Sequence, residues 1–275
     1  MIYELDRTNY FKVENLLTGD LINIEIAGVI QGFNPGWIFV DDINSPKTAM
    51  VWSKAIEGFY FIGDENNKEF NDCIDTYIDN EIVRRARVLG LDSFEFSGTS
   101  SKWDNTIEEI FKNRNLNKSK QLTYKNKKID GKLADDIKLQ DEYKLNRVTK
   151  ALFNSEISNL SFLENMILDW WSSVDDFLNY GVGYCIIVEN KIISCCITSC
   201  VTDYALGSHT VTIEEYRKKG LAKVLIFEFL KYCKENGLEA HWDCMDKNIS
   251  SKALAESCGY KREFDYTLYE FEFHK

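Results

Sequence analysis

The chain has 275 residues, of which 44% are apolar and 13% aromatic, so it can fill the core of one large or two small domains and is not a disordered chain. Its 44 acidic residues outnumber its 33 basic ones and give a net charge of −11, which argues against nucleic acid or an anionic membrane as partner, because both need a basic surface. The first residues, MIYELDRTNY, lack the features of a signal peptide, and no apolar run approaches the roughly 20 residues of a spanning helix, so we expect a soluble, cytoplasmic protein.

The first half alternates strand-like and helical segments. Aromatic and β-branched residues bounded by Gly, Pro and Asn predict strands at 36–42 and across 49–64. The next segment is a helix that ends at Gly90 and carries one apolar face, made of Ile74, Ile78, Ile82, Ala86 and Leu89. A strand at 92–98, a helix at 100–113 and a strand at 119–125 complete this half.

The second half repeats this order after two leading helices, which are expected at 142–153 and 160–181. The predicted elements are then strands at 182–188, 191–204 and 206–213, a helix between Gly220 and Gly237, a strand at 239–245, a helix at 250–258 and a strand at 264–273. The matching order indicates an internal duplication of one α/β unit. The basic, polar stretch 113–132 marks a junction near residue 130, which predicts domains at 1–130 and 131–275.

The turn before the helix at Gly220 indicates chemistry. Unpaired amides and the dipole at a helix N-terminus attract an anion, and Gly220 and Ala222 leave room for a bulky one. Arg217, Lys218 and Lys219 add positive charge. The alternative is an ordinary solvated turn, but cations at this end of a helix oppose its dipole by about 0.3–1 kcal/mol each. The stretch therefore favours an anion cradle.

Four segments of the second half match a known family. YRKKGLA fits the [RQ]-x-x-G-x-[GA] signature of the GNAT-superfamily acetyltransferases, with Arg217, Gly220 and Ala222 at the defining positions. DKNISSKALAESCGY fits the later segment of that superfamily, an Asn followed by a helix and a Gly-aromatic pair. The stretches WSSVDDFLNYGVGYCIIVENKIISCCIT, YRKKGLA and HWDC resemble the GNAT subfamily that includes zwittermicin A resistance proteins. The likeness covers about residues 130–273, and the length and order of the first half also suit it.

The resemblance implies an α/β (α+β) protein with the GNAT fold, a mixed, mostly antiparallel sheet flanked by helices. In that fold the fourth and fifth strands, here about 206–213 and 239–245, splay apart to admit acetyl-CoA. The implied cofactor-binding residues are Thr212 and Ile213 for the pantetheine arm, and Arg217, Lys218, Lys219, Gly220, Leu221 and Ala222 for the pyrophosphate. Asn248 and Ser251 would contact the lower pantetheine or the adenosine, or else cap a helix.

The first half carries a different turn at the corresponding place. GDENNKEFNDCID is acidic and has no glycine at the key position, so it would repel a pyrophosphate. We expect a degenerate, non-catalytic GNAT-like copy that supports the active half or lines the acceptor pocket.

Acetyl transfer to an amine needs a deprotonated nitrogen, a hydrogen-bond donor to the thioester oxygen and a proton for the thiolate. GNAT enzymes usually achieve this by direct attack in a ternary complex. The resemblance implies a backbone N–H near Val211, at the usual fourth-strand bulge, as donor, whereas Ala255 occupies the position of the usual general-acid Tyr. The candidates for acid or base are His209, His241, Asp243 and either Tyr266 or Tyr269, and each histidine could equally be a packed or surface side chain.

The cysteines and histidines give no sign of other chemistry. The eight cysteines mostly lie in apolar runs without a CxxC pair, and the three histidines lack ligand spacing, so we expect no disulfide, no metal and no acyl-cysteine. The resemblance therefore predicts an acetyl-CoA-dependent N-acetyltransferase that acts on a primary amine of a small molecule, such as an antibiotic. A non-catalytic acyl-CoA-binding or regulatory protein is the alternative, and transfer of a larger acyl group is a third possibility. The sequence specifies neither the acceptor nor the oligomeric state.

Overall fold

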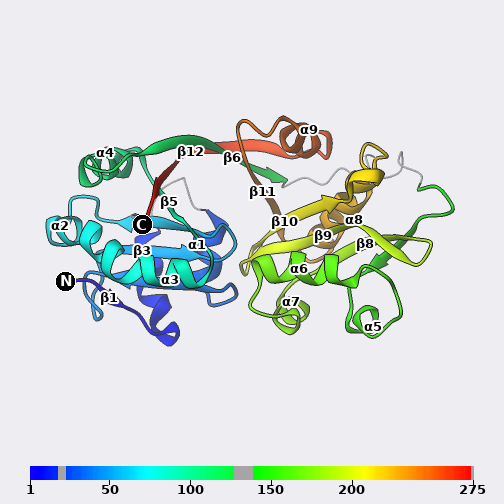
Figure 1. The fold of residues 1–275 in the computed structure, drawn as a ribbon, viewed down its shortest axis with the longest axis horizontal. Coiled ribbons are helices and arrows are strands. Elements are labelled where there is room, and N and C mark those ends of the chain that lie inside the picture. Colours follow the sequence, from blue (N-terminus) through cyan, green and yellow to red (C-terminus); the bar gives the residue numbers. More distant parts are fainter. Residues whose placement is uncertain (18–22, 127–138, 274–275) are drawn as a thin grey trace. The chain divides into compact units, whose positions relative to one another are not determined.

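The structure, a computed structural model, describes residues 1–17, 23–126 and 139–273, so the expected junction near residue 130 lies outside the described residues. The chain divides into two compact units (Figure 1). The first unit comprises Met1–Leu122, Met245–Lys247 and Phe264–Lys275, and the second comprises Thr123–Cys244 and Asn248–Glu263. The end of the chain thus belongs to the first unit, which a single cut of the sequence does not provide.

The first unit is a sheet with helices packed on it. Its strands lie in the order β1-β2-β3-β4-β5-β12. All neighbours are antiparallel except β4 and β5, which are parallel. The elements are β1 (Tyr3–Glu4), the 3-10 helix η1 (Arg7–Leu16), α1 (Ile24–Ile30), β2 (Gly36–Val40), β3 (Thr48–Ser53), β4 (Gly58–Gly63), α2 (Lys68–Tyr77), the π-helical turn η2 (Ile78–Ile82), α3 (Val83–Val88), β5 (Ser93–Gly98) and α4 (Ser101–Ile110). Two strands, β6 (Asn117–Asn126) and β12 (Lys261–Glu272), have residues in both units.

Both faces of this sheet are buried, which explains why its strands read as continuous apolar runs. Every residue of β3 is buried. One face packs an aromatic core that includes Phe61, Phe96 and Trp103 against α2 and α4. The other face packs Val51 and Ile62 against η1 and α1.

The second unit has the same architecture. Its strands lie in the order β6-β11-β10-β9-β8-β7, antiparallel from β10 to β7 and parallel between β10 and β11. The elements are β7 (Lys144–Arg147), α5 (Lys150–Phe153), α6 (Leu160–Trp170), α7 (Val174–Tyr180), β8 (Gly183–Val188), β9 (Lys191–Val201), β10 (Ala205–Thr212), the 3-10 turn η4 (Glu214–Tyr216), α8 (Leu221–Glu235), β11 (Glu239–Met245) and α9 (Ile249–Ser257).

One predicted helix of this unit is wrong. The segment 142–153 carries apolar residues at helical spacing, but Lys144–Arg147 forms the edge strand β7, and only Lys150–Phe153 is helical. Pairing explains the difference, because Leu145 lies opposite Ile186 of β8 in the antiparallel ladder. A short segment beside an open sheet edge gains ladder hydrogen bonds that its helical propensity does not outweigh.

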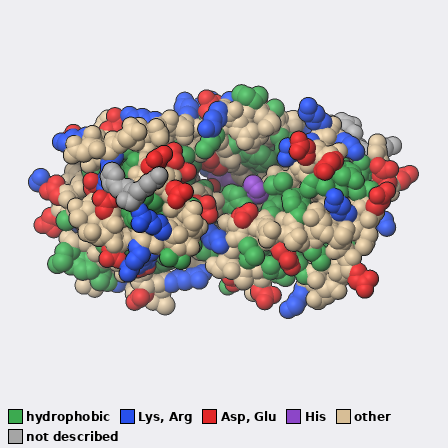
Figure 2. Space-filling view, viewed as in Figure 1, with side chains coloured by type: hydrophobic (Ala, Val, Ile, Leu, Met, Phe, Trp, Pro, Cys, Tyr) green, Lys and Arg blue, Asp and Glu red, His purple; other side chains and the backbone are tan. Residues whose placement is uncertain are grey.

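Two further observations concern the described residues only. None of the helices in 1–17, 23–126 and 139–273 is long and apolar enough to cross a membrane. On the face shown in Figure 2, lysine and arginine side chains are interspersed with acidic ones rather than gathered in one basic area.

Candidate functional site

Strands β10 and β11 run side by side over a short distance only. Ala205, Leu206 and Gly207 pair in parallel with Glu239, Ala240 and His241, and this is all the pairing between the two strands that the described residues show. β10 continues to Thr212 along β9 alone. The strands therefore separate after Gly207 and His241, and we call this point the fork. Past the fork, β10 has an unpaired edge that can bind an extended ligand as an added strand.

The hydrogen-bond donors available at this edge are the β10 amides that point away from β9. Ile213 donates its N–H to the carbonyl of Ile193, on the β9 side, at 3.0 Å. The register between β10 and β9 is regular from the fork onward. Because backbone groups alternate along a strand, the amide of Val211 also points to β9, whereas those of Thr210 and Thr212 point to the open edge.

The open edge leads to the N-terminus of α8. Gly220 is the N-cap of this helix and has a φ of +79°. A Cβ added to it would meet no atom within 4 Å, so open space lies in front of the turn. The backbone hydrogen bonds of the described residues include none from the amides of Leu221 or Ala222, and no acidic residue lies in the first turn. A phosphate fits such a positive, uncovered helix end.

The three cations of the turn are arranged differently from one another. Arg217 donates from Nε to the carbonyl of Thr212 at 3.1 Å, which braces the end of β10. Lys218 is exposed and has a φ of +62°. The ammonium of Lys219 lies 4.7 Å from the ring centre of Tyr216 and donates to the hydroxyl of Tyr143 at 3.4 Å. The chain therefore holds two of the three cations in place itself.

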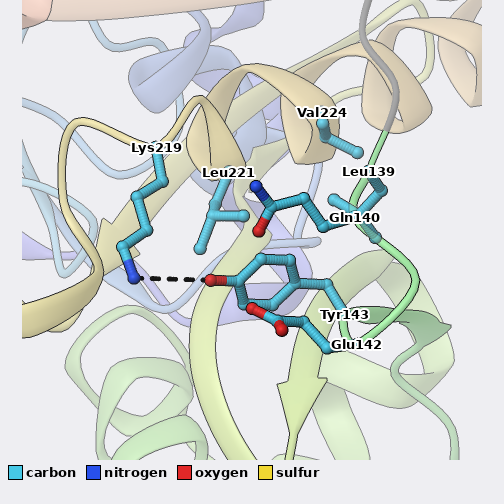
Figure 3. A pocket seen from close by; sticks show the side chains of 7 residues that line it. All are labelled: Leu139, Gln140, Glu142, Tyr143, Lys219, Leu221 and Val224. Atoms are coloured by element: carbon cyan, nitrogen blue, oxygen red, sulfur yellow. Dashed lines mark hydrogen bonds between the residues drawn. The ribbon is translucent and has the colours of Figure 1, made fainter.

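A pocket of about 380 Å³ opens beside Lys219 and the first turn of α8 (Figure 3). It is lined by Leu139, Gln140, Glu142, Tyr143, Lys219, Leu221 and Val224. A second pocket of the same size shares Glu142, Tyr143 and Lys219 but adds the carboxylates of Glu189 and Glu215. The two added carboxylates make the second pocket less suited to an anion than the first. Sequence reasoning missed Tyr143, because it lies 76 residues from Lys219 in the chain.

His209 lies just past the fork, on the side of the sheet that α6 covers. Its imidazole packs against the indole of Trp170, with ring centres 4.7 Å apart. Burial lowers the pKa of His209, and the carboxylate of Asp169 opposes that shift. The net shift is downward, so the ring is neutral at pH 7 and can accept a proton.

His241 and Asp243 share this face of the sheet, because Gly207 pairs with His241 and side chains alternate along both strands. His241 is 3% exposed, and its Nε2 lies 3.5 Å from a carboxylate oxygen of Glu239. Asp243 accepts a hydrogen bond from the Thr123 hydroxyl at 3.3 Å. The three acid–base candidates therefore lie on one face of the sheet, and His209 is more exposed than the buried His241.

Comparison with known protein families shows to which family the chain belongs. The model of the GNAT acetyltransferase family matches residues 14–269, which is nearly the whole chain. The chain belongs to the GNAT acetyltransferase family. It is therefore an acyltransferase of a family that generally uses acetyl-CoA, and the predicted GNAT fold is confirmed.

Similar proteins cover the chain from end to end. A curated relative, the "Uncharacterized N-acetyltransferase YdfB" of Bacillus subtilis, is 27% identical over 271 residues, or 98% of each chain. A GCN5-related N-acetyltransferase-like protein of Streptococcus suis superposes with a TM-score of 0.66 at 20% identity, covering 96% of this chain and 99% of that one. A tandem GNAT protein from the clavulanic acid biosynthesis pathway gives a TM-score of 0.62 at 9% identity, covering 100% and 99%. These likenesses extend through both units.

The backbone N–H of Val211, expected as the oxyanion donor, does not point to the open edge of β10. The bulge of β10 was expected near Val211, but the register shift lies between Gly207 and Ser208, where β9 carries an extra residue. The amide of Val211 faces β9, so the open-edge amide beside it belongs to Thr210. Ile213 likewise uses its N–H on Ile193 and its carbonyl on the amide of Tyr216, at 3.0 Å each. Of the two residues expected to meet the pantetheine arm, only Thr212 has an amide on the open edge.

Asn248 and Ser251 serve the fold. The side chain of Asn248 caps α9 by accepting from the amide of Ser251 at 3.1 Å. The hydroxyl of Ser251 accepts from the indole N–H of Trp242 at 2.9 Å. Their helix-capping interpretation therefore has direct contacts behind it, and we leave them out of the cofactor site proposed below.

Neither C-terminal tyrosine candidate belongs to the second unit, which contains the fork. Ala255 is fully buried on α9. Tyr266 and Tyr269 belong to the first unit, where the hydroxyl of Tyr266 lies 3.3 Å from that of Tyr60 and the hydroxyl of Tyr269 donates to Glu108 at 3.2 Å.

The first unit lacks a fork at the corresponding strand pair. β4 stays paired with β5 up to Phe61 and Gly98. Past that point the amide of Thr99 donates to the carbonyl of Phe61 at 3.3 Å, and the indole of Trp103 donates to the carbonyl of Gly63 at 3.2 Å. The chain's own groups occupy the edge that β10 leaves open.

Seven of the eight cysteines are buried. Burial raises the pKa of Cys185, Cys196 and Cys233 to about 12, which keeps these thiols protonated and weakly nucleophilic. Within 1–17, 23–126 and 139–273, the side chains of His, Cys, Asp and Glu form no group of three or more that could hold a metal ion.

Proposed function

We propose that this protein transfers the acetyl group of acetyl-CoA to a primary amine of a small molecule, by direct attack within a ternary complex. One observation carries the proposal: the fork leaves a five-residue edge of β10 unpaired, from Ser208 to Thr212, and that edge ends at a glycine-led helix N-terminus. An elongated thiol ester with a pyrophosphate matches this combination, because one part pairs as a strand and the other needs a positive cradle.

Different residues would bind different parts of acetyl-CoA. The amides of Thr210 and Thr212 would receive the pantetheine arm along the open edge. The amides of Leu221 and Ala222 would receive the pyrophosphate, with Gly220 leaving the approach clear and Arg217, Lys218 and Lys219 supplying positive charge. Acetyl-CoA bound in this way supplies the thioester.

The reacting groups lie at the fork. The Thr210 amide is placed to donate to the thioester oxygen as negative charge develops there. His209 would accept the proton of the amine while the new N–C bond forms and the C–S bond breaks, with His241 and Asp243 on the same face. Neutral His209 suits this role, since burial lowers its pKa.

The part of the second unit where we place the amine acceptor is acidic. Residues 152–216, which include α6, α7 and β8 to β10, contain nine acidic residues and a single lysine. Asp169 acts on His209 directly. This distribution favours a positively charged amine, and the resemblance to zwittermicin A resistance proteins makes an amine antibiotic our proposed acceptor. The first unit, with its closed β4–β5 edge, would then be a non-catalytic copy.

Two measurements test the proposal. Acetyl-CoA and CoA should raise the melting temperature of the purified protein, and a panel of cationic, neutral and anionic amines should then be tested for release of free CoA thiol. We expect thiol release with cationic amines. Stabilisation by CoA without release for any amine would favour the non-catalytic alternative, and no stabilisation at all would contradict the site.

A further inference from the structure

Two carboxylates of the first unit lie side by side without a cation between them. Glu270 of β12 is directly opposite Glu95 of β5 in the antiparallel ladder, so both side chains project from the same face of the sheet. Neither carboxylate has an ion-pair partner among the residues that the structure describes. Like charges directly opposite each other destabilise a pair of strands, so this arrangement lowers the stability of the protein unless a positive charge neutralises it.

A third carboxylate adds to the negative charge at this place. Glu57 belongs to the turn that leads into β4. Burial raises the pKa of Glu95, and the charges of Glu270 and Glu57 raise it further. No basic group of the described residues opposes these effects on Glu95. A cation bound here would therefore be attracted by three side chains.

A buried hydroxyl on the same face of the sheet provides an independent observation. Ser97 follows Glu95 by two residues along β5, so its side chain points to the same side, about 7 Å further along the strand. Ser97 is 1% exposed, and its hydroxyl oxygen has no hydrogen-bond partner among the described residues. Such a hydroxyl is rare in folded proteins, because it has lost its hydrogen bonds to water without replacement. It indicates a place for a polar ligand atom.

Aromatic and aliphatic side chains adjoin these polar groups. Ser97 pairs with Tyr60 of β4, whose ring centre lies 6.2 Å from that of Tyr266. The hydroxyls of the two tyrosines are 3.3 Å apart. Tyr266 and Ile56 pack against the same apolar cluster, to which Tyr60 belongs. Because tyrosine rings attract organic cations and offer carbon surface, these surroundings suit a cation with a carbon body.

We propose that Glu57, Glu95, Ser97 and Glu270, which we call the Glu95 site, bind the ammonium group of a small organic amine. A primary ammonium group has three N–H donors and no acceptor. Two of its donors match the carboxylates of Glu95 and Glu270, and the third matches the hydroxyl of Ser97. The tyrosine rings contact the carbon body of the ligand. This inference goes beyond the proposed function, because the site lies within the first unit and its ligand needs no acetyl-CoA.

The site predicts opposite effects on stability and on binding. Glu95→Gln removes a contact between like charges, and Ser97→Ala removes a hydroxyl that has no partner. Either substitution should therefore leave the melting temperature of the unliganded protein equal or higher. Both should weaken binding of the amine. A residue that served only the fold would instead lower the melting temperature when it is replaced.

The test is calorimetric titration of the full chain with phenethylammonium, a primary ammonium ion with a carbon body, in the absence of acetyl-CoA. We expect saturable binding to the wild type. Phenylpropanol, a neutral molecule of similar size, should bind at least about tenfold more weakly, because it lacks the charge that the carboxylates attract. Glu95→Gln should weaken binding of phenethylammonium by about tenfold or more, and Ser97→Ala by about two- to tenfold.

Glu109→Gln is the matched control. The side chain of Glu109 is 75% exposed on α4, which packs on the other face of the sheet, and its carboxylate lies 2.6 Å from the ammonium of Lys112. This substitution changes the net charge of the first unit by the same amount as Glu95→Gln. It should leave the affinity for phenethylammonium unchanged. An equal loss of affinity in both variants would be a general effect of charge and would overturn the site.

The outcomes separate this inference from the proposed function. No saturable binding to the wild type, or equal affinities for phenethylammonium and phenylpropanol, would overturn the inference. Binding that Asp169→Asn abolishes and Glu95→Gln leaves unchanged would also overturn it, because the amine would then occupy the proposed acceptor region. Binding that depends on Glu95, in a protein that releases no CoA thiol with any amine, would support the inference and contradict the proposed function. If Glu95→Gln does not fold, an unchanged affinity in Ser97→Ala overturns the site.

Discussion

The substitution Gly220→Glu should remove tight CoA binding while the protein still folds. Gly220 has a φ of +79°, which costs a residue with a side chain about 1–2 kcal/mol. Its added Cβ would meet no atom within 4 Å, so no packing cost adds to this strain. A typical domain has 5–15 kcal/mol of stability, so the variant should fold with a lowered melting temperature.

The effect on binding comes from charge. A carboxylate about 5 Å from a phosphate charge is repelled by about 3 kcal/mol at an effective dielectric constant of 20 and by about 1 kcal/mol in water. Each phosphate charge should therefore weaken CoA binding by about 5- to 150-fold, since 1.4 kcal/mol is a factor of ten. Higher salt should reduce the effect, because the turn is exposed.

Two control variants isolate this charge. Gly220→Gln has nearly the same size and backbone strain without the charge. Gly237→Glu places the same side chain on a residue with a φ of +70° and open space around its Cβ, just beyond the other end of α8. Gly237→Glu should lose similar stability and keep wild-type affinity for CoA.

The assay is calorimetric titration with CoA, alongside thermal unfolding of each variant. The predicted order of affinity is Gly237→Glu, then Gly220→Gln, then Gly220→Glu. Equal dissociation constants for the Glu and Gln variants at Gly220 would show that no phosphate lies at this helix end, and the proposed cradle would be wrong.

The other predictions concern the acceptor side and the Lys219 contact. His209→Gln should lower kcat/KM by about 10²- to 10⁴-fold. It should also remove the acidic limb of the pH–rate profile, whose midpoint lies below the usual histidine pKa because burial lowers the pKa of His209; a limb that persists in the variant would assign it to another group. Asp169→Asn should raise KM for a diamine but not for a matched monoamine, and equal changes for both would remove Asp169 from acceptor binding. Tyr143→Phe removes the acceptor of an exposed lysine and should weaken CoA binding by at most about fivefold with kcat unchanged, as measured by titration and steady-state kinetics.

Local patterns predicted most of the fold and the turn that leads into α8. The glycines that end the helices, the apolar strand runs and the R-x-x-G turn are short-range features, and they placed β10, α8 and β11 within a few residues. The segment 142–153 was misread because its edge pairing with β8 depends on residues about 40 positions away. No local pattern carries that information.

The details of the candidate site depend on which way each backbone amide of β10 points and on contacts between residues far apart in the sequence. The extra residue of β9 at the Gly207–Ser208 step shifts the register between β9 and β10. The sequence of β10 alone does not show where this shift falls or that the Val211 amide points to β9. Tyr143 lies 76 residues from Lys219 in the chain, and its hydroxyl meets the Lys219 ammonium only in the folded protein.

A ligand on the open edge of β10 would be approached from two sides. The α6 face presents a neutral imidazole and nearby carboxylates, which suit a cationic amine that must lose a proton. The α8 face has no acidic residue in the first turn of that helix. In the proposed reaction the amine would therefore enter on the α6 face, where His209 can accept its proton. In the first unit, Thr99 and Trp103 donate hydrogen bonds to carbonyls at the corresponding edge of β4, so that edge is already in use.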